Sequence, residues 1–277
     1  MSLKHPILGT PLPLGWRIAS VNEIKAPVHG ACVAGPFGSS ISAKYFVDDG
    51  VPVIRGSTLT DDLTKFVDDG FVFISEEYAT NFPSQQVVAD DLVFTCWGTI
   101  GQVGIVPKAS RFPRYVISNK QLKLRIDPSV ALPEYIYYHF AGPSAAEYIR
   151  SRAVGAAVPG INLGILKAFP VALPPLATQQ QIARILDTLG DLIDNNLRRI
   201  RVLEDMAQAQ WEHVEKAATQ RQPLSACADF LSGGTPSKAR TEYWRGDVPW
   251  VSSRELTRMR LQDTELHVTE EGADAGS

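Results

Sequence analysis

The stretch Leu173–Leu186, LPPLATQQQIARIL, marks the change from a β-rich sequence to a long helical one. Two adjacent prolines stop any preceding element. Thr178, followed three residues later by Gln181, has the pattern of a capping box. Residues 178–220 then contain no proline. We therefore predict a helix that begins at Thr178 and ends near Ala217, roughly 60 Å long at about 1.5 Å per residue.

Apolar residues recur at intervals of seven along this helix, which is typical of a coiled coil. Asn196 interrupts the apolar seam, and a polar residue at such a position fixes register and the number of partner helices. The alternative is a core helix that folds against its own domain. The predicted helix interface consists of Leu186, Leu189, Ile193, Asn196, Ile200 and Leu203.

The residues before the helix predict a β-rich domain with short helices. VPVIRG, FVFIS, DDLVFT and QVGIVP are of strand length and rich in β-branched or aromatic residues. QLKLRID alternates like a half-buried strand, and Pro133 stands where a helix would have its first turn. The expected fold class is α+β: a mixed, β-rich domain over residues 1–177, followed by a long coiled-coil-type helix over residues 178–220.

After residue 220 the sequence begins to repeat itself. YWRGDVPWVSSREL (Tyr243–Leu256) resembles YFVDDGVPVIRGSTL (Tyr45–Leu59), with the same spacing from proline to leucine. The two prolines, Pro52 and Pro249, are too far apart for a solenoid repeat and suit a duplicated domain. We therefore predict that residues 221–277 are a partial second copy of the first domain.

Three glycines in TCWGTIGQVGIVP (Thr95–Pro107) raise the question of nucleotide binding. Their spacing is not that of a dinucleotide fingerprint, and a further strand follows where a helix would be needed. The sequence also lacks a Walker lysine, a nucleophile elbow and the histidine or cysteine spacing of a metal site. The segment is therefore interpreted as a hairpin turn, and we expect no catalytic residue, metal or cofactor.

Paired acidic residues could serve as nuclease carboxylates, but such pairs more often occupy solvated turns, and we favour that interpretation. They are Asp48-Asp49, Asp61-Asp62, Asp68-Asp69 and Glu76-Glu77.

Charge is distributed unevenly along a chain whose formal net charge is only −3. Residues 44–91 are acidic, whereas KASRFPRYVISNKQLKLR (Lys108–Arg125) contains no acid and interleaves cations with aromatic residues. Such a loop suits a phosphate backbone, and Asn, Gln and Arg can contact base edges; the alternative is a solvated loop without a partner. The candidate DNA-binding residues are Arg55, Trp97, Thr99, Lys108, Arg111, Arg114, Asn119, Lys120 and Lys123.

The three cysteines are widely spaced and odd in number, which predicts a reducing, cytoplasmic environment rather than a disulfide framework. The sequence shows no apolar run of signal-peptide or membrane-spanning length. We therefore expect a cytoplasmic protein that does not enter a membrane.

An ordered set of segments resembles the DNA-specificity subunit of Type I restriction-modification systems. The PPL-x-x-Q entry into the long helix is the most specific of them. The set comprises GPFGSSI (35–41), GVPVIRGSTL (50–59), ADDLVFTCWGTIGQVGIVP (89–107), SNKQLKLRID (118–127), PEYIYYHF (133–140) and GINLGILKAFPVALPPLATQQQIARIL (160–186).

The resemblance implies two target-recognition domains, each followed by a helix, with the two helices packed antiparallel as a spacer. Each domain would read one half of a split site in double-stranded DNA. Methyltransferase subunits would dock on this scaffold, and a restriction and translocase subunit would join them. Catalysis would then belong to the partner subunits, not to this chain.

The sequence departs from the family pattern in two places. Thr178 stands where the family usually has an acidic residue, and the second recognition domain is only begun, which predicts a truncated subunit. The first alternative function is that of a remnant, which dimerises or binds methyltransferase without productive DNA recognition. A second copy of this chain, paired through the helix, is a further candidate partner. A self-contained nuclease or methyltransferase is the second alternative function, which the missing motifs disfavour.

Overall fold

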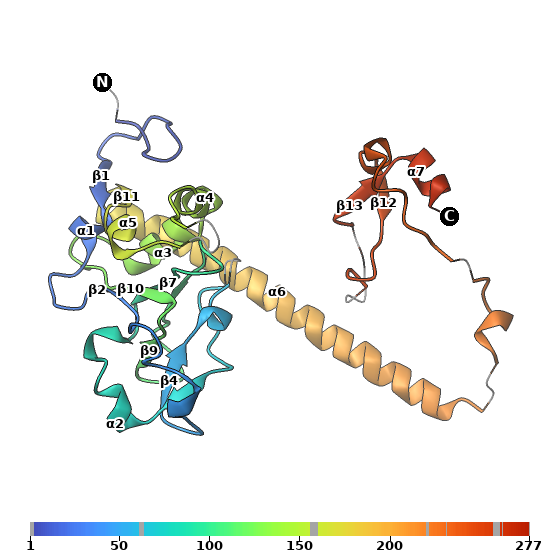
Figure 1. The fold of residues 1–277 in the computed structure, drawn as a ribbon, viewed down its shortest axis with the longest axis horizontal. Helices are drawn as coiled ribbons and strands as arrows, with labels where there is room; N and C mark the ends of the chain where they lie inside the picture. The colour runs from blue at the N-terminus through green and yellow to red at the C-terminus, as the bar shows by residue number, and fades with distance from the viewer. Residues whose placement is uncertain are drawn as a thin grey trace. The chain divides into compact units, whose positions relative to one another are not determined.

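A computed structural model of the chain describes residues 3–60, 64–155, 160–219, 222–230, 232–256, 261 and 263–276. The acidic pair Asp61-Asp62 lies outside these residues. The chain divides into two compact units, Met1–Leu203 and Glu204–Ser277. The first is an α+β domain from which the long helix α6 departs (Figure 1). The predicted fold class, a β-rich mixed domain followed by a long helix, is confirmed.

A four-stranded sheet forms the centre of the first unit, in the order β2-β10-β7-β8. Its strands are β2 (Cys32–Ala34), β7 (Leu92–Thr95), β8 (Val103–Ile105) and β10 (Gln121–Leu124). The main hydrophobic core lies between this sheet and the helices, where the rings of Phe94 and Phe140 meet edge to face at 4.8 Å. The predicted hairpin is confirmed, because β7 pairs antiparallel with β8 across a turn in which Gly98 and Gly101 have positive φ.

Strand β10 differs from its prediction in one respect. Its polar and apolar residues alternate as in a half-buried strand, but all four are buried. The physical reason is position, because β10 pairs with β2 on one side and with β7 on the other. The polar side chains of Gln121 and Lys123 therefore need hydrogen-bond partners inside the domain.

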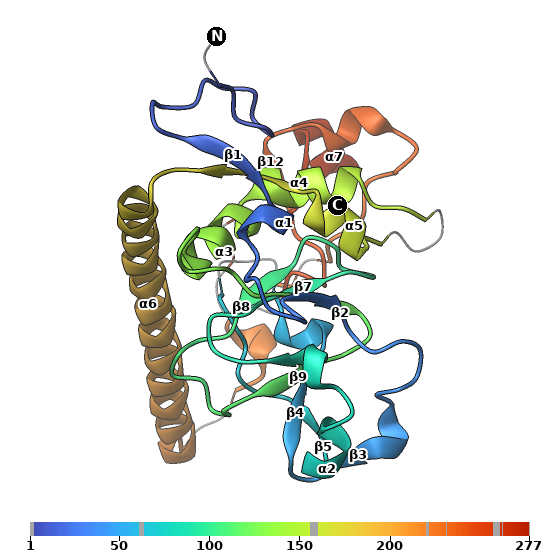
Figure 2. The same cartoon turned by 90° about the vertical axis from the view of Figure 1, so that its left-hand side faces the viewer.

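A five-stranded sheet, β3-β5-β4-β9-β6, lies beyond the central sheet, with α2 (Glu76–Ala79) next to it (Figure 2). Its strands are β3 (Phe46–Val47), β4 (Val51–Ile54), β5 (Val72–Ile74), β6 (Gln86–Val87) and β9 (Tyr115–Ile117). The central pair, β4 and β9, runs parallel, and the other pairs are antiparallel. The chain passes from β9 directly into β10, so one turn links the two sheets.

Short helices and a small ribbon cover the other side of the central sheet. Strand β1 (Arg17–Ser20) pairs antiparallel with β11 (Pro170–Leu173), and this pairing brings the beginning of the unit to the point where α6 starts. Pro133 opens α3, as predicted. The helices are α1 (Val21–Ile24), α3 (Pro133–Ala141), α4 (Pro143–Ser151) and α5 (Leu163–Lys167).

Helix α6 spans Leu176–Ala217 and contains 42 residues. The predicted start at Thr178 is wrong, because the amide groups of Thr178 and Gln179 already donate to the carbonyl of Pro175. The capping box is therefore not formed, and Thr178 lies within the first turn.

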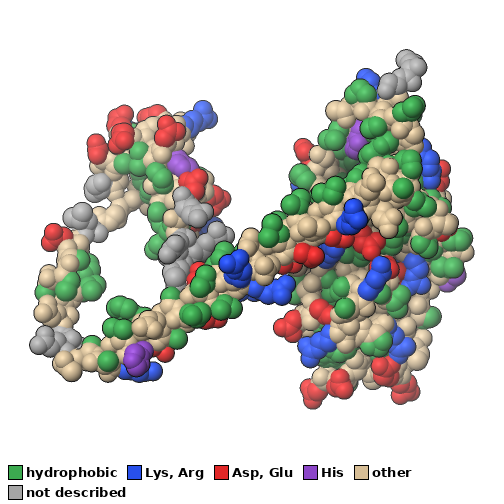
Figure 3. Space-filling view, turned by 180° about the vertical axis from the view of Figure 1, so that it is seen from behind, with side chains coloured by type: hydrophobic (Ala, Val, Ile, Leu, Met, Phe, Trp, Pro, Cys, Tyr) green, Lys and Arg blue, Asp and Glu red, His purple; other side chains and the backbone are tan. Residues whose placement is uncertain are grey.

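Only the first turns of α6 are covered by the domain, where Gln179 and Ala183 are buried. From Asp191 onward its residues are exposed, and hydrophobic side chains line its free surface (Figure 3). Among the described helices, none is both long and apolar enough to span a membrane.

The second unit repeats one module of the first. Strand β12 (Val248–Trp250) pairs antiparallel with β13 (Leu266–Val268), and Pro249 faces His267 as Pro52 faces Phe73 in the β4–β5 pair. Helix α7 (Glu270–Ala275) follows β13 with Thr269 as its N-cap, as α2 follows β5 with Ser75.

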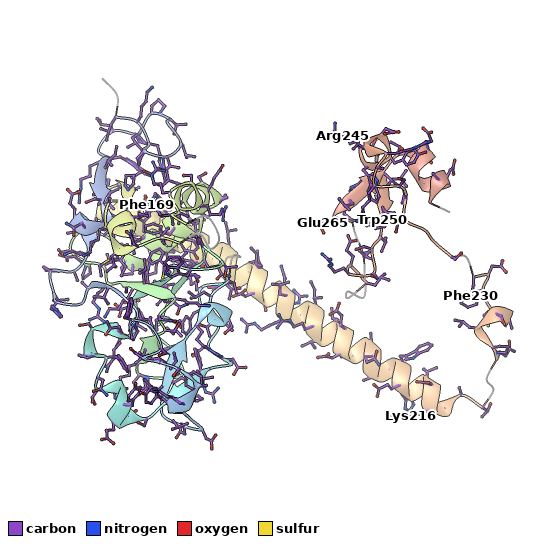
Figure 4. The ribbon with its side chains drawn as sticks, in the orientation of Figure 1. Phe169, Lys216, Phe230, Arg245, Trp250 and Glu265 are labelled. Carbon is purple, nitrogen blue, oxygen red and sulfur yellow. The ribbon has the colours of Figure 1, made fainter. Side chains whose placement is uncertain are left out.

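The close packing of a glycine against the carbonyl of a neighbouring strand is also repeated in the second unit. A Cβ atom on Gly50 would lie 2.3 Å from the Ile74 carbonyl oxygen, and one on Gly246 would lie 2.2 Å from that of Val268. Figure 4 shows Arg245, Trp250 and Glu265 gathered around the β12–β13 ribbon. The sequence similarity between the two segments therefore corresponds to a shared local structure.

Candidate nucleic-acid interface

The turn Ser118–Lys120 is the centre of the candidate site, because the ends of four strands meet there. The Ser118 amide donates to the carbonyl of Ile54 at the end of β4, and the Cys96 amide, after β7, donates to the carbonyl of Lys120 at 2.8 Å. The Gly35 amide, after β2, donates to the carbonyl of Gln121. Three loops are thus fixed around a single turn.

The buried side chain of Gln121 reinforces this junction. In the orientation that satisfies its hydrogen bonds, its amide nitrogen donates to the Ile54 carbonyl and its oxygen accepts from the Gly56 amide, each at 3.1 Å. The first residue of β10 is thereby tied to the end of β4. Arg55 stands between the two groups, and its enclosed Nε has no hydrogen-bond partner among the described residues.

The loop Gly35–Ser40 is held rigidly beside the turn. A Cβ atom on Gly35 would lie 1.8 Å from the Ser118 carbonyl oxygen, so only glycine fits there. The Asn119 side-chain amide donates to the Gly38 carbonyl at 2.8 Å, and the Ser40 hydroxyl donates to the Phe37 carbonyl at 2.6 Å. Between these anchors the Phe37 ring is 96% exposed.

A pocket of about 710 Å³ opens between this loop, the turn and the segment after β7. Phe37, Trp97, Asn119, Lys120 and Asn162 contribute to its lining, which is mostly apolar. Trp97 is 46% exposed, and a Cβ atom on Gly160 would lie 2.6 Å from its indole ring, so glycine allows the backbone to pack on that ring. We refer to the exposed residues Phe37, Trp97, Asn119 and Lys120 as the pocket rim.

The segments that line the pocket contain no acidic residue. Residues 34–38, 96–98, 119–120, 122 and 161–164 include no Asp or Glu, and Lys120 supplies positive charge. The lining of the pocket is therefore positive or neutral. The apolar surroundings also raise the pKa of the Cys96 thiol to about 11, because burial disfavours its thiolate.

The first part of the basic loop, residues 108–114, has a different environment from the pocket rim. Arg114 forms an ion pair with Glu76, and Arg111 lies 3.9 Å from Asp69. Lys108 pairs with Glu134 at 3.1 Å, and this hydrogen bond raises the pKa of Lys108. Two of the acidic pairs interpreted as solvated turns thus supply partners for the cations, and they neutralise much of the charge.

The side chains of Lys123 and Arg125 form hydrogen bonds within the domain. Lys123 is 3% exposed, and its ammonium group donates to the carbonyls of Ser84 and Gln86 at 2.9 and 2.7 Å. Burial lowers the pKa of Lys123. Arg125 forms two hydrogen bonds of 2.6 Å with the buried carboxylate of Asp91. Lys123 therefore cannot reach a DNA phosphate without leaving the domain, and we do not retain it in the interface.

The predicted DNA-binding residues thus fall into separate groups. Trp97, Asn119 and Lys120 line one pocket, Arg55 follows the strand that anchors the turn, and Thr99 is exposed in the neighbouring hairpin. Lys108, Arg111 and Arg114 pair with acidic residues elsewhere. Sequence reasoning missed Phe37 as a candidate, although a large aromatic residue inside a glycine-rich turn is a signal that could have identified it.

The predicted helix interface is placed on the free surface of α6. Leu189, Ile193, Ile200 and Leu203 are about half exposed, at 51, 50, 49 and 61%. Asn196 is exposed among them, and Leu186 is half-buried where the helix leaves the domain. The seam is therefore available for a further contact.

Comparison with known proteins identifies the class. Residues 38–205 match the family model of the Type I restriction modification DNA specificity domain, and this chain belongs to that family. The MjaIX specificity subunit of a Type I restriction enzyme from Methanocaldococcus jannaschii is 23% identical over 196 residues, which are 71% of this chain and 43% of the relative.

The EcoKI specificity subunit from Escherichia coli strain K12 is 25% identical over 240 residues, covering 86% of this chain and 46% of the relative. The chain therefore spans less than half the length of these two curated relatives. One solved structure, described as the structural basis underlying complex assembly and conformational transition of the type I R-M system, matches with a TM-score of 0.51 at 18% identity. The match covers 76% of this chain and 46% of the solved chain, and the two chains share the fold.

Proposed function

We propose that this chain is a sequence-specific DNA-binding subunit of a Type I restriction-modification complex. It directs partner methyltransferase and restriction subunits to a target site in double-stranded DNA, in the cytoplasm. The observation that carries the proposal is the acid-free pocket rim, held by a rigid turn, in a chain that belongs to the specificity-domain family.

The proposed division of labour follows the domain organisation. Residues 1–177 form the first recognition domain, residues 178–220 form the spacer helix, and residues 221–277 correspond to part of a second recognition domain. The shared β4–β5–α2 and β12–β13–α7 modules support the last assignment. Methyl transfer, ATP hydrolysis and cleavage belong to the partners, and this chain needs no cofactor of its own.

Within the recognition domain, the rim carries most of the DNA affinity. Lys120 is exposed on the turn, whereas Arg114 is paired with Glu76 and Arg111 lies 3.9 Å from Asp69, so that a carboxylate offsets part of the charge of each arginine. An unpaired cation releases DNA counterions in full, and a cation already paired to a carboxylate gains less. Arg55, Trp97, Thr99 and Asn119 are then placed to contact the backbone or base edges.

The test compares two sets of alanine variants by gel shift over a range of salt concentrations. Lys120→Ala should weaken binding to all duplexes and reduce the salt slope by about one unit. The double variant Arg111→Ala with Arg114→Ala should change the slope less. A chain that enriches no sequence from a random duplex pool, with or without its methyltransferase partner, would contradict the proposal.

The second candidate function is a dimerising or methyltransferase-binding module that does not read DNA productively. The exposed apolar seam of α6 is the observation that favours it. Purified methyltransferase subunit should bind such a module in the absence of DNA. The pattern of DNA methylation by that subunit should then be the same whether or not this chain is present.

A further inference from the structure

Phe37 is a large apolar side chain that its own domain presents to solvent. Its exposure of 96% does not come from a loose loop. The carbonyl of Phe37 accepts the Ser40 hydroxyl, the carbonyl of Ser40 accepts the Tyr78 hydroxyl at 2.7 Å, and Asn119 holds Gly38. The backbone that carries the ring is therefore anchored by hydrogen bonds, as the support of a preorganised contact for another molecule would be.

The surroundings of Phe37 indicate an anionic partner. The loop from Gly35 to Tyr45 contains no Asp or Glu, and Lys120 and Asn119 are exposed on the adjoining turn. An exposed apolar contact for another protein would not require a border free of acids, whereas a contact for DNA would, because every flanking group lies close to phosphates.

We propose that Phe37 inserts between two adjacent base pairs of the recognised duplex and unstacks that step. Proteins that insert a Phe or Leu side chain as a wedge recover the cost of unstacking through the additional contacts that the bent DNA makes. Lys120 and Asn119, on the turn that anchors the Phe37 loop, contact the flanking backbone. Phe37 thereby contributes to specificity through the deformability of the step it opens, without a hydrogen bond to a base.

This inference rests on the proposed DNA-binding function, and the experiment separates the two. The full chain, alone and with its methyltransferase partner, first selects a duplex from a random pool. 2-Aminopurine, whose fluorescence rises when it leaves the base stack, is then placed at each position of that duplex. The proteins are the parent, Phe37→Ala, Phe37→Leu and the control Leu14→Ala, in which an equally exposed apolar residue is removed.

The parent and Leu14→Ala should raise the fluorescence at one step, and Phe37→Leu should keep part of the signal. Phe37→Ala should abolish it and bind about tenfold more weakly, which is the scale of one lost aromatic–base contact. A mismatch introduced at the same step should restore much of this affinity, because the step is already weakened.

Two other outcomes have distinct meanings. If no duplex is selected, the DNA-binding function itself is wrong, and the wedge with it. If Phe37→Ala binds the selected duplex with unchanged affinity and fluorescence, only the wedge is wrong. Loss of methyltransferase binding by that variant would then identify Phe37 as a contact between subunits.

Discussion

The side-chain oxygen of Gln179 accepts a hydrogen bond of 2.9 Å from the backbone amide of Leu132. Leu132 is the N-cap residue of α3, and Gln179 lies in the first turn of α6. The Gln179 side-chain amide also donates to the Pro174 carbonyl at 2.9 Å, and its side chain is fully buried. One glutamine thus fixes the start of the long helix against the recognition domain.

Replacement of Gln179 should therefore lower the stability of the first unit. Gln179→Ala leaves the Leu132 amide and the Pro174 carbonyl without partners, and we expect a loss of about 2–4 kcal/mol in the free energy of unfolding. Urea denaturation followed by circular dichroism measures the change. Gln180→Ala, which removes the adjacent exposed glutamine, is the matched control and should have little effect. Equal stability of the two variants would mean that the buried hydrogen bonds do not hold the helix.

The sequence predicted the order and type of the main elements because their signals are local. The proline before α3, the glycines of the β7–β8 turn and the proline-free run of α6 each act on the backbone near them. The start of α6 was misplaced because Thr178 was taken as its N-cap, whereas the carbonyl of Pro175 already accepts hydrogen bonds from the amides of Thr178 and Gln179. The full burial of β10 depends on strands on both sides of it, which alternation within one segment cannot indicate.

The candidate site could be predicted only in part, for a similar reason. Trp97, Asn119 and Lys120 were identified by residue type, and the fold brings them to one pocket. The basic loop appeared free because the sequence does not show that Glu76 and Asp69 lie opposite Arg114 and Arg111. Phe37 was missed although it stands inside a glycine-rich turn, because that signal in the sequence was not weighed; the structure shows that the residue is 96% exposed.

The exposed seam of α6 predicts self-association of the chain. Ile193 and Ile200 are half exposed in a heptad seam, and apolar stripes of this kind usually acquire a partner. A dimer paired through this seam would carry two copies of the first recognition domain and should prefer an inverted repeat of one half-site. Analytical ultracentrifugation should detect it at micromolar concentration.

Charged residues in the seam should abolish this dimer. Ile193→Asp with Ile200→Asp should give a monomer, because each carboxylate would be buried against the partner helix. Arg201→Asp with Gln208→Asp adds the same two residues on the same helix outside the seam and should leave the dimer intact. A parent chain that stays monomeric at high concentration would show that the seam is not a self-association surface.

Asp91 should be essential for the stability of the recognition domain. Its carboxylate is 1% exposed and accepts two hydrogen bonds from Arg125 and one from the Val88 amide. Asp91→Asn leaves the guanidinium without its counter-ion, although Arg125 is partly exposed and solvent can compensate. We expect a loss of about 2–3 kcal/mol in the free energy of unfolding.

The neighbouring carboxylate provides a control for Asp91. Asp90 forms a long ion pair of 3.6 Å with Lys108, whose side chain is 70% exposed. Asp90 also has a positive φ of 69°, a conformation that asparagine tolerates. Asp90→Asn should therefore cost less than about 1 kcal/mol. If the two variants unfold at the same urea concentration, the buried ion pair does not stabilise the domain.

His139 should make the domain less stable in mildly acidic solution. Its Nε2 atom is enclosed and has no hydrogen-bond partner among the described residues. Burial, with a smaller contribution from the charge of His5, lowers the pKa of His139 from 6.5 to about 4. Between these values the unfolded chain takes up a proton at this residue and the folded chain does not, so the free energy of unfolding falls as the pH falls. The stability contributed by the neutral ring is complete above pH 6.5, and at most about 3 kcal/mol is lost by pH 4. Urea midpoints measured across this range should therefore decrease for the parent as the pH falls, and decrease less steeply for His139→Gln, which has no proton to gain.

The control for His139 is His29→Gln, which removes an exposed histidine and should retain the slope of the parent. A parent and a His139→Gln variant with the same slope would show that the buried imidazole is not the source of the acid sensitivity.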